Sequence, residues 1–137
     1  MMTAHIVYRA GYKYQLHAPY NYDTGIRGVE YVSDFLVLQI DGVLRIAAGY
    51  AWDGPSGPTY DTTSAMRGSL VHDALYQLMR AGHLPNDHRL RADELLYRMC
   101  REDGMGRVRA WAWYRMVRWF ASGAAAAQSE PEIYYAP

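Results

Sequence analysis

The chain has 137 residues, half of them apolar, which is enough for one domain with a buried core. Its 14 basic and 14 acidic side chains cancel, so the overall charge does not favour nucleic acid or an anionic membrane. The single cysteine, Cys100, excludes an intrachain disulfide framework, and its place in an apolar helical pattern predicts a small buried side chain.

No signal peptide or membrane span is expected. The first residues lack a basic stretch followed by a long apolar run, and no segment reaches about 18 uninterrupted apolar residues. We therefore expect a protein that is made and kept in the cytoplasm unless a partner carries it elsewhere.

The first half of the chain is predicted to form a small antiparallel sheet. Residues 6–16 alternate loosely between polar and apolar, as in a strand, and HAPYNYDTGIRG (17–28) is typical of a turn-rich loop. The strongest β pattern is DFLVLQIDGVLRIAAGY (34–50), in which Asp41-Gly42 suits the positive φ angles of a tight turn. We expect Phe35–Ile40 and Val43–Ala48 to pair as a hairpin.

Near Thr62 the apolar period changes to that of a helix, with Thr62 or Thr63 as the N-cap and Gly82 as the stop. A second helix is expected between an Asn86 or Asp87 cap and Gly104. Because the link is short, the two should form an antiparallel hairpin. Their predicted buried stripes are Leu70, Val71, Ala74, Leu75, Leu78 and Met79 on the first helix, and Ala92, Leu95, Leu96, Met99 and Cys100 on the second.

A third helix, GRVRAWAWYRMVRWFASG (106–123), mixes arginines with aromatic residues on every side. Such a helix could bind a membrane interface or a nucleic acid backbone. The favoured interpretation is a contact with a second copy or another protein through Trp111, Trp113, Arg115 and Trp119. The whole pattern predicts one α+β domain over residues 1–123, its sheet packed on the helices, and a tail over 124–137 that contributes to these contacts.

Helical geometry predicts a candidate site. At 100° per residue, His72 and Tyr76 border the buried face of the first helix, while Asp73 points away from it. Asp93 falls about 80° from the centre of the second stripe, where it could meet His72 between the helices. A carboxylate that holds one ring nitrogen leaves the other free to act as a base, so His72 and Asp93, with Tyr76 beside them, form the candidate catalytic set.

The loop before the first helix adds a possible cation site. Asp73 and Asp53, with the bent backbone near Gly54 and Gly57, offer the oxygen ligands that calcium or magnesium requires. Such an ion would polarise a carbonyl or phosphoryl oxygen beside the base. The alternative is structural: His72 bonds a backbone carbonyl, Asp73 pairs with Arg67 or Arg80, and the loop is an ordinary proline–glycine turn.

Three motifs together resemble a small uncharacterised domain family of tailed phages and prophages. In order they are GYAWDGPSGP (49–58), RGSLVHDALY (67–76) and RADELLYRM (91–99). The resemblance implies a phage context, in the host cytoplasm or on a virion, without an established activity. It also implies a phage structural protein among the possible partners.

The same arrangement is similar to that of secretory phospholipases, which place a glycine-rich calcium loop before a helix with His-Asp and a tyrosine. Carried over, His72 would activate water, Asp73 would bind calcium, and Asp93 would orient His72. The chain lacks the cysteines of that framework and its loop is rich in proline, so the similarity is an analogy.

Two functions remain open. The first is a metal-assisted hydrolase that acts on an ester, phosphoester or amide. The second is a non-catalytic virion or assembly component in which the His-Asp motif is structural.

Overall fold

The computed structural model describes residues 6, 8–9, 14–52, 54 and 63–120. They form two compact units that divide after position 53, the first made of strands and the second of helices. The α+β class is thus confirmed, whereas the interpretation as one domain stays a prediction. The predicted tail at 124–137 lies outside the described residues, as do Thr62, Asp53 and Gly57.

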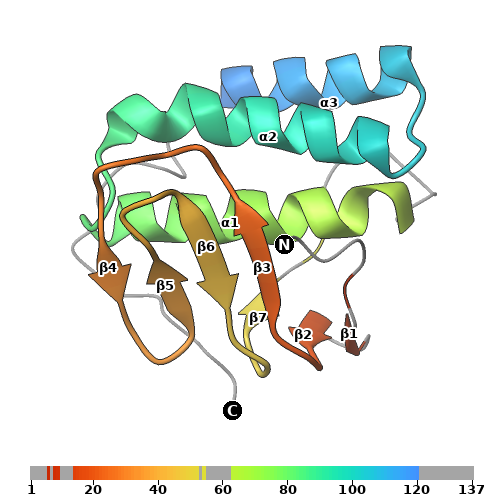
Figure 1. Ribbon diagram of the computed structural model, residues 1–137. Helices are drawn as coiled ribbons and strands as arrows, with labels where there is room; N and C mark the ends of the chain where they lie inside the picture. The colour runs from red at the N-terminus through yellow and green to blue at the C-terminus, as the bar shows by residue number, and fades with distance from the viewer. Residues whose placement is uncertain (1–5, 7, 10–13, 53, 55–62, 121–137) are drawn as a thin grey trace. The chain divides into compact units, whose positions relative to one another are not determined.

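The strand unit contains two antiparallel sheets where the sequence predicted one. In the three-stranded sheet, β2 (Tyr14–Leu16) lies between β1 (Tyr8–Arg9) and β7 (Ala51–Trp52). The four-stranded sheet has the order β3 (Tyr20–Asp23), β6 (Val43–Ile46), β5 (Leu36–Leu38) and β4 (Tyr31–Val32) (Figure 1).

The predicted hairpin is confirmed, since β5 and β6 pair antiparallel with Leu38 opposite Leu44. The strands are shorter than expected because the turn is wider than two residues. The N–H of Gly42 donates to the carbonyl of Gln39 over 2.9 Å, and Gly42 takes a φ of +101°. A β-carbon there would lie 3.2 Å from Asp23 Oδ1, so both the backbone angle and the space favour glycine.

Strand β3 occupies part of the segment that the sequence predicted as a loop. Its Asn and Asp residues are typical of turns, so the alternation of buried and exposed positions is hard to recognise in the sequence. Tyr20 and Tyr22 point to the buried side with exposed fractions of 1% and 7%. The burial of two large rings on one face outweighs the turn preference of the residues between them.

The helical unit consists of three α-helices with two short 3-10 turns among the described residues. Both predicted apolar stripes are confirmed, because every member is at most 2% exposed. The elements are 3-10 turn η1 (Thr63–Ala65), α1 (Met66–Arg80), 3-10 turn η2 (Asn86–His88), α2 (Arg89–Glu102) and α3 (Arg107–Phe120) (Figure 1).

The predicted helix stops are confirmed, whereas Thr63, Asn86 and Asp87 do not cap the α-helices and Thr62 lies outside the described residues. Gly82 and Gly104 have φ angles of +82° and +101°, which suit the left-handed residue that ends a helix. At the other ends, Ala65 and His88 precede α1 and α2 and neither makes a side-chain cap. The 3-10 turns η1 and η2 displace the α-helix starts beyond Thr63, Asn86 and Asp87.

Helices α1 and α2 are antiparallel, as predicted. The guanidinium of Arg67, near the start of α1, forms ion pairs of 2.7 Å with Glu102 and 3.1 Å with Asp103 at the end of α2. The backbones approach closely at Gly68, where an added β-carbon would lie 3.2 Å from Leu96 Cδ1. This close contact sets the seam in which the candidate site lies.

Helix α3 packs on α2 through one buried cluster. The cluster includes Cys100 and Leu96 from α2 and Ala110 and Trp113 from α3. The ring of Tyr97 meets Tyr114 edge to face, with centroids 6.3 Å apart. Trp113, predicted at an interface, is 5% exposed and belongs to this core, so that prediction is corrected.

Candidate functional site

The candidate site is built around Asp93, whose side chain is completely buried in α2. His72 on α1 places its Nε2 2.7 Å from Asp93 Oδ1, and the imidazole is 9% exposed. The predicted meeting of His72 and Asp93 between the two helices is therefore confirmed. A contact of this length between a ring nitrogen and a carboxylate is a strong hydrogen bond, which fixes the ring orientation.

Tyr76, one turn after His72, completes the same cluster. Its hydroxyl donates to Asp93 Oδ1 over 2.6 Å. Its ring lies against the imidazole, with centroids 4.2 Å apart and planes tilted by 32°. One carboxylate oxygen thus receives two groups from α1, which holds His72 and Tyr76 as a rigid pair.

The other carboxylate oxygen faces two arginines that were not predicted from the sequence. Arg118 on α3 donates from Nη1 to Asp93 Oδ2 over 2.9 Å. Arg89, four residues before Asp93 on α2, lies 3.6 Å from the same oxygen and also donates to the carbonyl of Arg118 over 3.4 Å. The carboxylate of Asp93 therefore joins all three helices.

Burial and pairing act against each other on the pKa values of the site. For Asp93, burial favours the neutral acid, but hydrogen bonds from His72, Tyr76 and Arg118 outweigh it and lower the pKa below the usual 3.8. For His72, burial lowers the pKa, but the carboxylates of Asp73 and Asp93 outweigh it and raise the pKa above 6.5. Burial and the Asp93 carboxylate both raise the pKa of Tyr76, which stays a neutral donor.

Asp73 lies on the other side of the imidazole. Its Oδ1 is 3.9 Å from His72 Nδ1, which is longer than a hydrogen bond, and its side chain is 38% exposed. Because Asp93 holds Nε2, Nδ1 is the ring nitrogen that remains for chemistry. It faces Asp73, whose side chain is partly exposed.

The predicted cation ligands are only partly within the described residues. Asp73 supplies one hard oxygen donor, and Gly54 is a buried residue with a φ of +88°. The other two, Asp53 and Gly57, lie outside that part of the chain. Across residues 14–52 and 63–120 and the few others described, no group of three His, Cys, Asp or Glu side chains could hold a metal ion.

The third helix exposes some of the residues predicted for contacts. Trp111 and Trp119 are 56% and 75% exposed, and the guanidinium of Arg115 lies 5.8 Å from the centre of the Trp111 ring. Val108 on the same helix is 81% exposed. None of the helices in the described part of the chain has the length and hydropathy that crossing a bilayer requires.

Comparisons with protein-family models, with curated proteins and with solved structures gave no match to the chain. The resemblances to a phage domain family and to secretory phospholipases therefore remain predictions from the motifs. The geometry around Asp93 is what points to a function.

Proposed function

We propose that the helical unit carries a hydrolytic site in which His72 is the general base. The supporting observation is the 2.7 Å contact between His72 Nε2 and the buried Asp93 carboxylate. In this arrangement Asp93 holds the imidazole in one orientation, so that Nδ1 can take a proton from water. The activated water would attack an ester, phosphoester or amide.

His72 can act as a base only in its neutral form. Because Asp73 and Asp93 raise the pKa of His72 above 6.5, the base appears as the pH rises through that raised pKa. Hydrolysis should therefore increase with pH on the alkaline side of 6.5. Asp93 stays ionised over this range because its pKa is lowered.

A divalent cation is a further part of the proposal. Asp73 would bind the ion, and Asp53 and the backbone near Gly54 and Gly57 would supply the other ligands. Calcium or magnesium bound there would polarise the substrate oxygen beside His72. Thermal unfolding with each ion and with a chelator, on the wild type and Asp73→Asn, tests this part separately. A stabilising shift that Asp73→Asn removes is expected, and its absence would restrict the proposal to His72 and Asp93.

The hydrolytic proposal is tested by assaying chromogenic carboxylic esters, phosphodiesters and anilides across pH 5–9 with the wild type and four variants. His72→Gln keeps an amide that can donate to Asp93 but has no base, and should abolish turnover in a folded protein. Asp93→Asn should lose most of it. The controls are His17→Ala and Glu94→Gln, whose side chains are exposed. If the wild type hydrolyses none of the three substrate classes, or if His72→Gln is fully active, the proposal fails.

A second function is supported by the exposed face of α3. Val108, Trp111 and Trp119 place large apolar side chains in solvent along one helix, as a protein contact surface would. We infer that a second copy of this chain covers them, within a phage or prophage assembly as the motifs imply. Sedimentation should give a dimer that the double variant Trp111→Ala, Trp119→Ala converts to a monomer. A monomeric wild type at high concentration would contradict this inference.

A further inference from the structure

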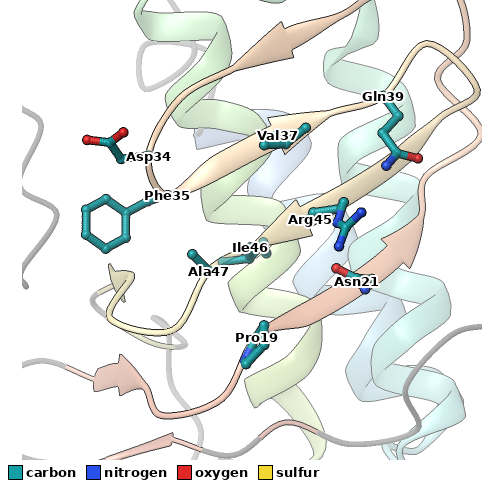
Figure 2. A pocket seen from close by; sticks show the side chains of 9 residues that line it. All are labelled: Pro19, Asn21, Asp34, Phe35, Val37, Gln39, Arg45, Ile46 and Ala47. Atoms are coloured by element: carbon teal, nitrogen blue, oxygen red, sulfur yellow. The ribbon is translucent and has the colours of Figure 1, made fainter.

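The four-stranded sheet has a hollow on its solvent-facing side (Figure 2). In one row of its lining, Asn21 on β3 lies opposite Arg45 on β6, and Arg45 lies opposite Val37 on β5. These three residues share one face because they occupy the same position in the register of adjacent strands. The hollow encloses about 420 Å³, within the range of sites that hold small ligands.

One end of the hollow offers a cation set between two amides. Figure 2 shows the Arg45 side chain between those of Gln39 and Asn21. Arg45 is exposed, and no hydrogen bond or ion pair joins its guanidinium to another described residue. A guanidinium with free donors binds a carboxylate through two parallel hydrogen bonds, and the neighbouring amides can pair with an adjacent peptide group.

The opposite end offers a carboxylate. Asp34 and Phe35 immediately precede β5, and Figure 2 shows both at the far end from Arg45. Asp34 is exposed, and its side chain likewise has no hydrogen bond or ion pair with a described residue. Since Arg45 lies opposite Val37, three positions after Asp34, the two charges are about 10 Å apart along the strand direction.

The surface between the two charges is largely apolar. Its apolar lining residues include Val37, which lies opposite Arg45, together with Ala47, Pro19 and Phe35 (Figure 2). A ligand that fits must therefore carry a negative group at one end, an apolar body, and a positive group at the other. A phosphate would meet a single arginine and the repulsion of Asp34, so its double charge is poorly matched.

We propose that this hollow binds a short peptide of about three residues with free termini, since an extended chain advances about 3.3 Å per residue. The terminal carboxylate pairs with Arg45, apolar side chains cover Val37 and Ala47, and the terminal ammonium pairs with Asp34. This site lies in the strand unit and does not depend on the hydrolytic function proposed for His72.

The test is an NMR titration of the full chain with the tripeptide alanyl-leucyl-alanine, followed through the side-chain amides of Asn21 and Gln39. We expect saturable binding, weakened at least about tenfold by C-terminal amidation and several-fold by N-acetylation, because each modification removes one charged pair. No saturable change up to about 20 mM peptide would overturn the proposal. Acetate or inorganic phosphate that binds as tightly as the tripeptide would also overturn it, because the site would then recognise an anion alone.

Two variants assign the ends of the peptide. Arg45→Gln should bind the free acid and the amide equally, and Asp34→Asn should bind the free amine and the acetylated form equally. The exposed-site controls Arg98→Gln and Asp87→Asn should keep both preferences. If Arg45→Gln still distinguishes acid from amide, the carboxylate is bound elsewhere and the proposal is wrong.

Discussion

The Nη1 of Arg118 lies 2.9 Å from Oδ2 of Asp93, so α3 contacts the same carboxylate whose other oxygen holds His72. Asp93 is fully buried, whereas the side chain of Arg118 is 28% exposed. A carboxylate taken out of water needs this many partners because its desolvation cost must be offset by hydrogen bonds and charge. The contacts of Asp93 therefore couple the positions of three helices to the orientation of one imidazole.

Replacing Asp93 should strongly destabilise the helical unit. Asp93→Asn removes the charge that compensates Arg118 and Arg89 and replaces an acceptor of Tyr76 with an amide. We expect a loss of about 3 kcal/mol in the free energy of unfolding, which is the lower end for a broken buried ion pair because Arg118 keeps contact with solvent. Urea unfolding measures this loss. The neighbouring Glu94→Gln, on the exposed side of α2, should change it by less than about 0.5 kcal/mol, and equal losses would contradict the network.

Stability should depend on pH through His72 and Asp93 in opposite directions. The raised pKa of His72 contributes stability that is complete below 6.5 and is lost as the pH rises through the raised value. The lowered pKa of Asp93 contributes stability that is present above 3.8 and is lost as the pH falls through the lowered value. The contribution of the pair is therefore greatest between 3.8 and 6.5.

Urea unfolding at a series of pH values, on the wild type and on His72→Gln, isolates the histidine contribution. The difference in unfolding free energy between the two proteins should shrink as the pH rises above 6.5. A difference that stays constant from pH 5 to 9 would mean that the pKa of His72 is not raised in the folded protein.

Two tryptophans on α3 should respond differently to the same substitution. Trp113 is 5% exposed inside the cluster with Cys100 and Leu96, so Trp113→Ala should cost about 3–5 kcal/mol of unfolding free energy through lost burial and a cavity. Trp111 is 56% exposed, and Trp111→Ala should cost less than about 1 kcal/mol. The two variants are matched controls for each other, and thermal and urea unfolding measure both losses. Similar losses would show that α3 packs in a different rotation.

Cys100 should be unreactive in the folded protein. Its thiol is completely buried, and this burial, together with the nearby Asp103, raises the pKa to about 12. A thiol reagent such as Ellman's reagent at pH 8 should label Cys100 only after denaturant is added. Rapid labelling of the native protein would show that the α2–α3 cluster opens readily.

The His72–Asp93 contact could be predicted because each residue borders an apolar stripe on its own helix. Once two stripes face each other in an antiparallel hairpin, residues at the same edge must meet, and helical periodicity alone gives that edge. The contact of Arg118 with Asp93 could not be predicted in this way. It depends on how α3 is rotated and shifted along α2, and a helix with aromatic residues on every side leaves that rotation undetermined. The misplacement of Trp113 has the same cause.

In the strand unit, the hairpin was predictable from its two apolar runs around Asp41-Gly42. Strand β3 was not, because its alternation is carried by tyrosines between Asn21 and Asp23, whose local preference is for turns. The hollow near Arg45 also could not be predicted from the sequence. It arises from the register of three strands, which places residues far apart in the chain side by side on one face.

Activity and stability should both depend on the pKa of His72. The neutral form of His72 is the proposed base, and the protonated form is the one that stabilises the buried pair, so a single pKa must govern both. As the pH rises through it, hydrolysis should increase while the difference in unfolding free energy between the wild type and His72→Gln declines. The two midpoints, one from the pH–rate profile and one from urea unfolding, should agree within about 0.5 pH unit. A stability midpoint without any change in rate would mean that the histidine and aspartate only hold α1 and α2 together.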